Sequence, residues 1–380
     1  MTPLRSLTVA LSAVAAVALT PLPAQAVVDD TPAQSASFNG TVRAVATYGS
    51  TTFVAGDFTR ATDSRGTFVR RHLAAVNTRT GRLLPWHPRT NGAVYAIAAY
   101  RGRVYIGGAF TVVNGRRRAR VAKLSVRTGA RDGTFRAVTN APVRAIELTS
   151  TRLYLGGDFT RAQGKPRGHL AAYTRRTSRL LAWHPRANGR VYDVAVRHGL
   201  LWVGGAFTAI NGNASARRIA ALRQGTGTVS ASFRMRGAPV VRALQVTRTR
   251  VYVGAAGSGG HLYVRTRSGS PLWSKTFDGD VNAIALLNNV VYVGGHWRYI
   301  CTNKPSTDPQ GDCVDEAGLV PRLAAFNGSG TLQSWVPRPD SALGVLAMTT
   351  SAASDTLAIG GGFTAFNKGA IRQPAFAIFR

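Results

Sequence analysis

Six of the short apolar segments in this chain are preceded by a residue with an oxygen-bearing side chain, often followed by glycine. If these segments form the inner strands of a ring, the six side chains gather near the mouth of a central channel. There they could coordinate a cation or hold sugar hydroxyl groups. The interpretation we favour is that Asn-Gly and Asp-Gly make tight turns, because these residues tolerate positive φ and bond to their own backbone. The six residues are Asn39, Asn91, Asn140, Asn188, Asp278 and Asp340.

Arginine and tyrosine alternate at the second residue of these apolar segments. Interleaved cations and aromatic rings could bind an acidic glycan or a nucleic acid through charge and stacking. Packing of arginine on tyrosine between neighbouring repeats is the alternative, and it is the commoner use of such pairs. The set consists of Arg43, Tyr95, Arg144, Tyr192, Arg242 and Asn282.

A third set of arginines stands just before a recurring Leu-Ala-Ala segment, as Arg70, Arg167 and Arg322 do. Their recurrence indicates a role inside each repeat, such as bonding loop carbonyl groups.

Two cysteines, Cys301 and Cys313, enclose a short loop that interrupts the repeat pattern. In an exported protein this pair predicts one local disulfide. Acidic residues nearby suggest a Ca²⁺ site, although their spacing does not match an EF-hand. We favour a solvated loop held by the disulfide, and we expect no other cofactor. The acidic residues are Asp308, Asp312, Asp315 and Glu316.

Signatures of catalysis are missing from the sequence. None of the seven histidines forms a His-x-His or His-Glu-x-x-His motif, and no Gly-x-Ser-x-Gly elbow stands out. Glu147 and Glu316 are the only glutamates, so a glycosidase with paired glutamates is not expected.

An internal repeat supplies the elements that would carry these residues. A strand that ends in small residues, usually followed by Phe-Thr, recurs seven times at intervals of 40 to 66 residues. We number the units one to seven by the first small residue of each copy. These residues are Ala55, Gly107, Gly156, Gly204, Gly254, Gly294 and Gly360.

Each unit is expected to hold four short strands. A Val-x-Ala-Ile-like strand comes first, the Val-Tyr-Val-Gly-Gly strand second and the Leu-Ala-Ala strand third, and the fourth carries an aromatic residue such as Trp86 or Trp183. No sustained helical period occurs in the mature chain. The pattern predicts an all-β fold, a seven-bladed β-propeller of four-stranded antiparallel blades. Small residues in the second strand would permit close packing of sheets, and the aromatic residues would wedge between blades.

The two ends of the chain are expected to meet. The chain ends on a third strand, and the segment from Ala33 to Phe38 stands where other units have their fourth strand. This N-terminal strand should complete the last blade and close the ring, which hides sheet edges. Units one and three share long motifs, as do units two and four, which indicates that a pair of blades was duplicated.

The Val-Gly-Gly-x-Phe-Thr, Arg-x-Leu-Ala-Ala and Trp-x-Pro elements resemble a secreted β-propeller repeat family of actinobacteria, the delta-sixty-type repeats of unknown function. The resemblance covers essentially the whole mature chain and implies the fold without implying an activity. The segment from Thr78 to Trp86 is also similar to the tryptophan-docking repeats of quinoprotein-type dehydrogenases, a likeness that we attribute to blade packing.

The first 26 residues have the features of a signal peptide. Arg5 precedes an apolar run from Leu7 to Leu19, and Ala24-Gln25-Ala26 is the small-x-small pattern of a cleavage site. The run is too short for a mature membrane span. We therefore expect residues 27–380 to form one secreted, extracellular propeller domain, with an insertion at residues 299–320. We expect a monomer with no membrane span.

The charge of the chain is strongly basic, with 48 Lys and Arg against 16 Asp and Glu. Residues 41–300 hold 41 basic and 8 acidic residues, whereas residues 301–380 hold six of each. Such a surface attracts polyanions, and the attraction weakens with salt.

Together these features favour a non-catalytic extracellular binding or scaffold propeller for an anionic polymer or glycan of the cell envelope. Nucleic acid would bind only non-specifically. The alternative is a carbohydrate-active or quinoprotein-type enzyme with its site at the mouth of the central channel, and a third interpretation is an adhesion protein without a small ligand.

Overall fold

The computed structural model describes residues 27–380, except for residues 258, 302–315 and 342. Within this part of the chain nearly all regular structure is β, and the one helix is the short 3-10 turn η1 (Asn367–Gly369). No helix among the described residues is long and apolar enough to cross a membrane.

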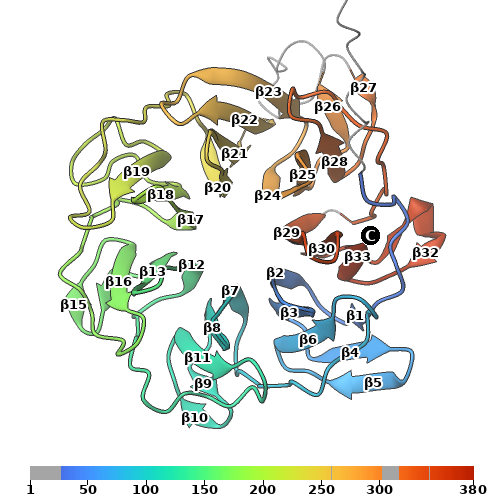
Figure 1. Cartoon of the computed structure of the whole chain (residues 1–380), viewed down its shortest axis with the longest axis horizontal. Coiled ribbons are helices and arrows are strands. Elements are labelled where there is room, and N and C mark those ends of the chain that lie inside the picture. Colours follow the sequence, from blue (N-terminus) through green and yellow to red (C-terminus); the bar gives the residue numbers. More distant parts are fainter. Residues whose placement is uncertain (1–26, 258, 302–315, 342) are drawn as a thin grey trace, which may run out of the picture.

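Antiparallel sheets stand around a common centre, and each contributes an inner, a second and a third strand (Figure 1). The inner strands are β2 (Val42–Tyr48), β7 (Val94–Tyr100), β12 (Val143–Leu148), β17 (Val191–Arg197), β20 (Val240–Val246), β24 (Val281–Leu287) and β29 (Val345–Ser351). The second strands are β3 (Thr51–Gly56), β8 (Arg103–Gly108), β13 (Arg152–Gly157), β18 (Leu200–Gly205), β21 (Arg250–Ala256), β25 (Val290–Gly295) and β30 (Thr356–Gly361). The third strands are β6 (Leu73–Asn77), β11 (Val121–Ser125), β16 (Leu170–Thr174), β19 (Ile219–Arg223), β22 (Gly260–Thr266), β28 (Leu323–Phe326) and β33 (Phe376–Phe379).

The second strands are buried along almost their whole length, because each lies in the middle of its sheet with neighbouring sheets on both faces. This explains their continuous apolar sequence, without the polar alternation of a half-exposed strand. The inner strands are only partly buried, since one edge of each faces the centre.

Neighbouring sheets pack as closely as their small residues predict. A Cβ atom added to Gly107 would lie 2.6 Å from Cγ1 of Val143 in the next unit, which leaves no space for a side chain. Trp86 lies 4.9 Å from the ring of Phe53, and its Nε1 donates to the carbonyl of Ser125 in the following unit at 2.8 Å. The aromatic residue therefore packs between units, as expected.

The prediction of four short strands in every unit is wrong for most units. Only the fifth unit has a complete fourth strand, β23 (Pro271–Phe277), among the described residues. In units one to four and in unit six the fourth segment makes a single bridge to the third strand, such as that between Val76 and Leu83. The segment leaves the ladder after this bridge because it must turn its aromatic side chain toward the next sheet.

The N-terminal segment contacts the C-terminal strand. Ala33 forms a bridge with Ile378, and the amide of Asp29 donates to the carbonyl of Arg380 at 2.6 Å. The prediction that Ala33 to Phe38 forms one strand on the last sheet is wrong for its second half. Strand β1 (Ser37–Phe38) pairs instead with β4 (Arg60–Asp63), because Phe38 packs against Phe58 with 4.4 Å between ring centroids.

Short hairpins cover the outside of several units (Figure 1). They pair β4 with β5 (Gly66–Val69), β9 (Val112–Val113) with β10 (Arg116–Arg117), β14 (Arg161–Ala162) with β15 (Lys165–Pro166), and β31 (Ala365–Phe366) with β32 (Ile371–Arg372).

The base of the predicted insertion is also a hairpin. Strands β26 (Tyr299–Cys301) and β27 (Glu316–Leu319) pair with each other and extend the sheet of the fifth unit beyond β23. Cys313, Asp308, Asp312 and Asp315 lie outside the described residues, so the disulfide and the calcium site stay predictions.

Candidate functional site at the central cavity

A cavity of about 690 Å³ lies at the centre and is lined by residues of all the inner strands. Each inner strand carries a β-bulge directly after a valine at or near its start, as between Val42 and Ala44 or between Val143 and Ala145. A bulge leaves one residue outside the ladder and re-aims its side chain. The bulged residues are Arg43, Tyr95, Arg144, Tyr192, Arg242, Asn282 and Leu346.

The bulged arginines and tyrosines of units one to five stack on one another in chain order. The Arg43 guanidinium lies 5.6 Å from the ring centroid of Tyr95, and that of Arg144 lies 5.3 Å from the same ring. Arg144 and Arg242 likewise lie 5.7 and 4.6 Å from the ring of Tyr192. We call Arg43, Tyr95, Arg144, Tyr192 and Arg242 the cation–aromatic belt. The predicted stacking between units is thus present, on the wall of a cavity.

Two arginines of the belt are neutralised by their own unit. Nε of Arg43 lies 2.6 Å from Oδ2 of Asp57. Nε and Nη2 of Arg144 bond the two carboxylate oxygens of Asp158 at 2.7 and 2.8 Å, and this bonding raises the pKa of Arg144. Arg190 approaches Asp158 to 3.7 Å from the following unit.

The asparagines and aspartates before the inner strands are not among the residues that line this cavity. In each of these residues the side-chain oxygen Oδ1 accepts two consecutive backbone amides from the loop after the second strand, an arrangement that we call a clasp. Oδ1 of Asn91 accepts the backbone amides of Thr111 and Val112, both at 2.8 Å, and its Nδ2 donates to Oγ1 of Thr111. Oδ1 of Asp278 accepts the amides of Arg298 and Tyr299 in the same way. A ligand role for this set stays a prediction, but Oδ1 of each residue already accepts two backbone amides. Equivalent bonds form at Asn39, Asn140, Asn188 and Asp340.

The turn chemistry expected for these residues is wrong in its detail. None of the asparagines in the set has positive φ. Where glycine follows, close approach favours it, because a Cβ atom on Gly92 would lie 3.2 Å from Cα of Phe110. Asparagine is needed because its amide group satisfies the backbone of the loop that the glycine lies against.

Two cavity-lining carboxyl groups, Glu147 and Asp193, are functional candidates that the sequence analysis missed. Oδ2 of Asp193 accepts the amide of Leu244 in the next inner strand at 2.7 Å. Oε1 of Glu147 accepts the amide of Val196 at 3.3 Å, again from the next inner strand. Burial raises the pKa of each carboxyl to about 7.

The sequence repeat already marks Asp193 as unusual. The residue after the bulge is alanine in the other inner strands, and only the fourth unit has a carboxylate there. The equivalent alanines are Ala44, Ala96, Ala145, Ala243, Ala283 and Ala347.

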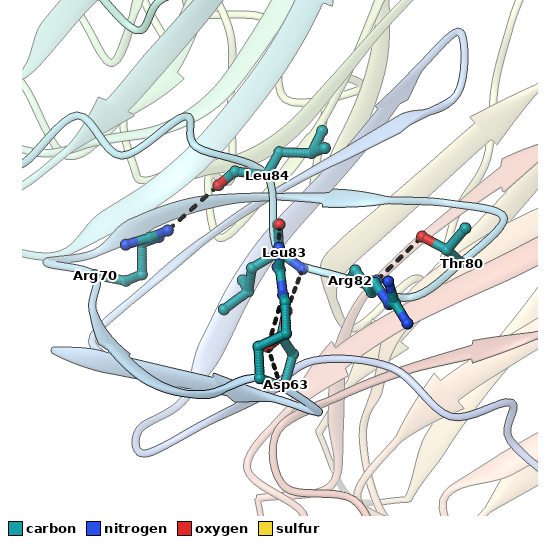
Figure 2. A network of polar contacts seen from close by, with 7 residues as sticks. Asp63, Arg70, Thr80, Arg82, Leu83 and Leu84 are labelled. Carbon is teal, nitrogen blue, oxygen red and sulfur yellow. Dashed lines mark hydrogen bonds and ion pairs between the residues drawn. The ribbon is translucent and has the colours of Figure 1, made fainter.

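Two of the arginines before the third strands, Arg70 and Arg167, have the predicted role inside their units. Nη2 of Arg70 donates to the carbonyl of Leu84 at 3.3 Å, beside the bond from the amide of Leu83 to Asp63 (Figure 2). Arg167 repeats the contact with Leu181 at 2.9 Å. Arg70 and Arg167 thus hold the fourth segments of units one and three against the loop that precedes the third strand. Arg322 instead donates to the carbonyls of Pro339 and Ser341, before the next inner strand.

The described residues contain no group of three or more His, Cys, Asp or Glu side chains placed to hold a metal ion. Glu316 is the first residue of β27, and the other acidic residues of the predicted calcium site lie outside the described part.

The fold is similar to that of solved β-propellers. The WD40 β-propeller domain of Doa1 is 12% identical, with 92% of this chain and 96% of that chain covered and a TM-score of 0.58. The RRP9 WD40 repeats are 11% identical, with 92% and 98% covered and a TM-score of 0.61. The computationally designed Ika8 protein is 14% identical, with 90% and 98% covered and a TM-score of 0.54. This chain has the β-propeller fold.

No family model matches the sequence, and no curated protein matches it. At these identities the structural similarity to known propellers concerns architecture alone.

Proposed function

We propose that this protein is a secreted seven-bladed propeller, closed by its N-terminal segment, that binds an anionic polymer or glycan without catalysis. The cation–aromatic belt carries the proposal. It places guanidinium groups and aromatic rings at consecutive bulges on the wall of one cavity, and such groups recognise acidic and ring-shaped ligands. The resemblance to the secreted actinobacterial repeat family supports the extracellular location.

The charge distribution supports an anionic ligand. Units one to five supply most of the excess of basic residues, and they are also the units that build the belt. Arg190, whose side chain is 60% exposed, adds a cation beside Asp158. A focused positive field raises the local concentration of polyanions and speeds their association.

Closure of the ring is supported by the contacts of residues 28 to 33. The amide of Val28 donates to the hydroxyl of Tyr292 at 3.0 Å, and Nε1 of Trp335 donates to the carbonyl of Asp29 at 2.9 Å. These bonds connect the N-terminal segment to the sixth unit, the bridge from Ala33 to Ile378 connects it to the seventh, and β29 packs against β2. A closed ring leaves the inner strands in a fixed circle, which keeps the belt in one geometry.

Binding is tested by titrating the folded protein with heparin, polygalacturonate, polyphosphate and a neutral dextran at several salt concentrations. We expect binding to the polyanions only, with an affinity that falls as salt rises. Arg242→Gln should weaken binding. Arg372→Gln removes an equal charge from an exposed site outside the cavity and is the matched control. The proposal is refuted by absence of binding to every polyanion at low salt.

A second candidate, a carbohydrate-active enzyme, is favoured by Glu147 and Asp193. A carboxyl group with a pKa near neutrality, on the wall of a cavity, is what a general acid requires. Turnover of an acidic oligosaccharide by the wild type, lost in Glu147→Gln and Asp193→Asn with the fold retained, would establish this function in place of the first.

A further inference from the structure

The repeat itself shows what neutralises an arginine at the bulge. In units one and three the residue after the second-strand glycines is an aspartate, and it pairs with the bulged arginine of the same unit. In units two and four the bulged residue is a tyrosine, and the partner position holds Ala109 or Ala206. Arginine at the bulge thus accompanies aspartate at the partner position, and tyrosine accompanies alanine.

The fifth unit breaks this correspondence. Val241 pairs with Ala255 in unit five, and Val42 makes the equivalent pair with Gly56 in unit one. The next residue in unit five, Ala256, pairs with Val240. Ala256 therefore stands where Asp57 and Asp158 stand in units one and three. Arg242 has the arginine of those units without their carboxylate.

The surroundings of Arg242 provide no substitute. Nε of Arg242 is buried without a hydrogen-bond partner, and its guanidinium makes no hydrogen bond or ion pair to any residue that the structure describes. Its contact is the ring of Tyr192 at 4.6 Å. The nearby carboxylate of Asp280 accepts the amide of Gly257 at 3.2 Å. A buried donor without an acceptor is costly, but Nε atoms of Arg70, Arg118, Arg167 and Arg265 are buried without a partner as well. What sets Arg242 apart is that it lines the central cavity and lacks the carboxylate of the equivalent arginines.

We infer that Arg242 forms a subsite for the carboxylate of an acidic ligand, which takes the place of the missing aspartate. The Arg144 pair shows how a carboxylate and a bulged arginine pair in this repeat, with one oxygen on Nε at 2.7 Å and the other on Nη2 at 2.8 Å. Because Nε of Arg242 is buried, a ligand in the cavity would bond the Nη atoms at the end of its guanidinium. A planar carboxylate matches this fork, and the stacked tyrosine holds the guanidinium in place. Asn282, at the next bulge, lines the same cavity and can bond a hydroxyl group of the ligand.

The inference deepens the proposed function, on which it rests, by naming the acidic group as a uronate-type carboxylate. It also predicts that the molecule has a single subsite of this kind. The carboxylates of Asp57 and Asp158 already fill the equivalent positions in units one and three, so one molecule should bind one carboxylate in this way.

The test supplies the missing carboxylate from the protein. Ala256→Asp should recreate the arginine–aspartate pair of the other units and exclude a ligand carboxylate. Ala109→Asp adds the same charge at the equivalent position of unit two and is the matched control. The probe is D-glucuronate, followed through the arginine Nε–H resonances and by calorimetry, with inorganic phosphate and sulfate as competing anions.

We expect wild-type protein and Ala109→Asp to bind glucuronate one to one. Ala256→Asp and Arg242→Gln should each lose at least tenfold in affinity, and Ala256→Asp should shift the Arg242 resonance without ligand. Arg242→Gln, which adds no buried charge, keeps the test decisive if Ala256→Asp fails to fold. Equal glucuronate binding by wild type and Arg242→Gln overturns the inference, as does tighter binding of phosphate or sulfate than of glucuronate.

Failure of the inference is distinguishable from failure of the proposed function. Salt-dependent binding of polymers with no effect of Ala256→Asp would leave the proposed function standing and remove the subsite. Binding of glucuronate that Ala256→Asp abolishes, with no polymer binding, would do the reverse.

Discussion

Asp193 in β17 accepts a hydrogen bond from the backbone amide of Leu244 in β20 at 2.7 Å, and so connects two neighbouring inner strands on the cavity wall. Glu147 makes the equivalent connection from β12 to the amide of Val196 in β17. An inner strand is the edge of its sheet, so its outward amide groups need acceptors from outside the sheet. The two carboxyl groups meet this need between units three, four and five.

These carboxyl groups should make the protein less stable as the pH rises toward neutrality. Burial raises the pKa of each to about 7, so the folded state holds a proton over a pH range in which the unfolded state has lost it. The stabilisation is fully present below about pH 4 and is lost as the pH rises to 7. We expect Glu147→Gln and Asp193→Asn, which keep the acceptor, to raise the free energy of unfolding at pH 8 by about 1–2 kcal/mol each.

Urea unfolding at pH 5 and pH 8 measures this effect as the difference between variant and wild type. The difference removes the contributions of His169 and His261, whose pKa values burial lowers and whose pH dependence has the opposite sign. A gain that is the same at both pH values would contradict the prediction.

Loss of one asparagine clasp should destabilise the fold without changing its charge. Asn91→Ala leaves the amides of Thr111 and Val112 without their acceptor, for an expected cost of about 1–2 kcal/mol. Asn91→Asp should cost less, because Asp340 already makes the same clasp, with Oγ1 of Thr364 donating to its Oδ2 at 2.5 Å. Thermal unfolding of both variants is the measurement, and equal stability of the alanine and aspartate variants would count against a clasp.

The buried ion pair of unit two should depend on both partners. Nζ of Lys123 lies 2.8 Å from Oδ2 of Asp132, with side chains 8% and 18% exposed. The third strands of units one and three have alanine at the lysine position, Ala75 and Ala172. Lys123→Ala alone should destabilise by about 3 kcal/mol, because it leaves a carboxylate without its partner.

The double variant Lys123→Ala, Asp132→Leu copies the residues of units one and three at these positions. It should recover most of the lost stability, since an apolar pair of fitting volume replaces a buried ion pair at little cost. A double-mutant cycle by denaturant unfolding measures the coupling, and additive losses would show that the pair contributes nothing.

Removal of the N-terminal segment should open the proposed ring. A mature chain that lacks residues 27–36 loses the bridge from Ala33 to Ile378 and the acceptor for Nε1 of Trp335. We expect a lower melting temperature and faster hydrogen exchange in β33 than in β16 of the third unit, which serves as an internal reference. Unchanged exchange in β33 would argue against closure by this segment.

The sequence repeat predicted most of the architecture, because each unit must bury its apolar second strand between two neighbours. The aromatic wedges and the small residues of the second strands had the predicted roles, as Trp86 and Gly107 show. A fourth strand was predicted in every unit, although most units form only a single bridge there, since strand propensity does not reveal where a segment must leave its sheet to bury an aromatic side chain. Asn91 was placed in a turn by its own preference, although its role is to bond a loop 20 residues away.

By itself, the sequence determined the repeat and the alternation of arginine with tyrosine at the second residue of the first strands, because these depend on local pattern. Only the tertiary structure decided which of those residues are satisfied. Ion pairing and pKa values depend on neighbours that strand register and sheet packing bring together, such as Leu244 beside Asp193 or Ala256 beside Arg242. Three arginines occupy equivalent positions in the repeat, and aspartates pair with Arg43 and Arg144, whereas Arg242 has alanine at the partner position.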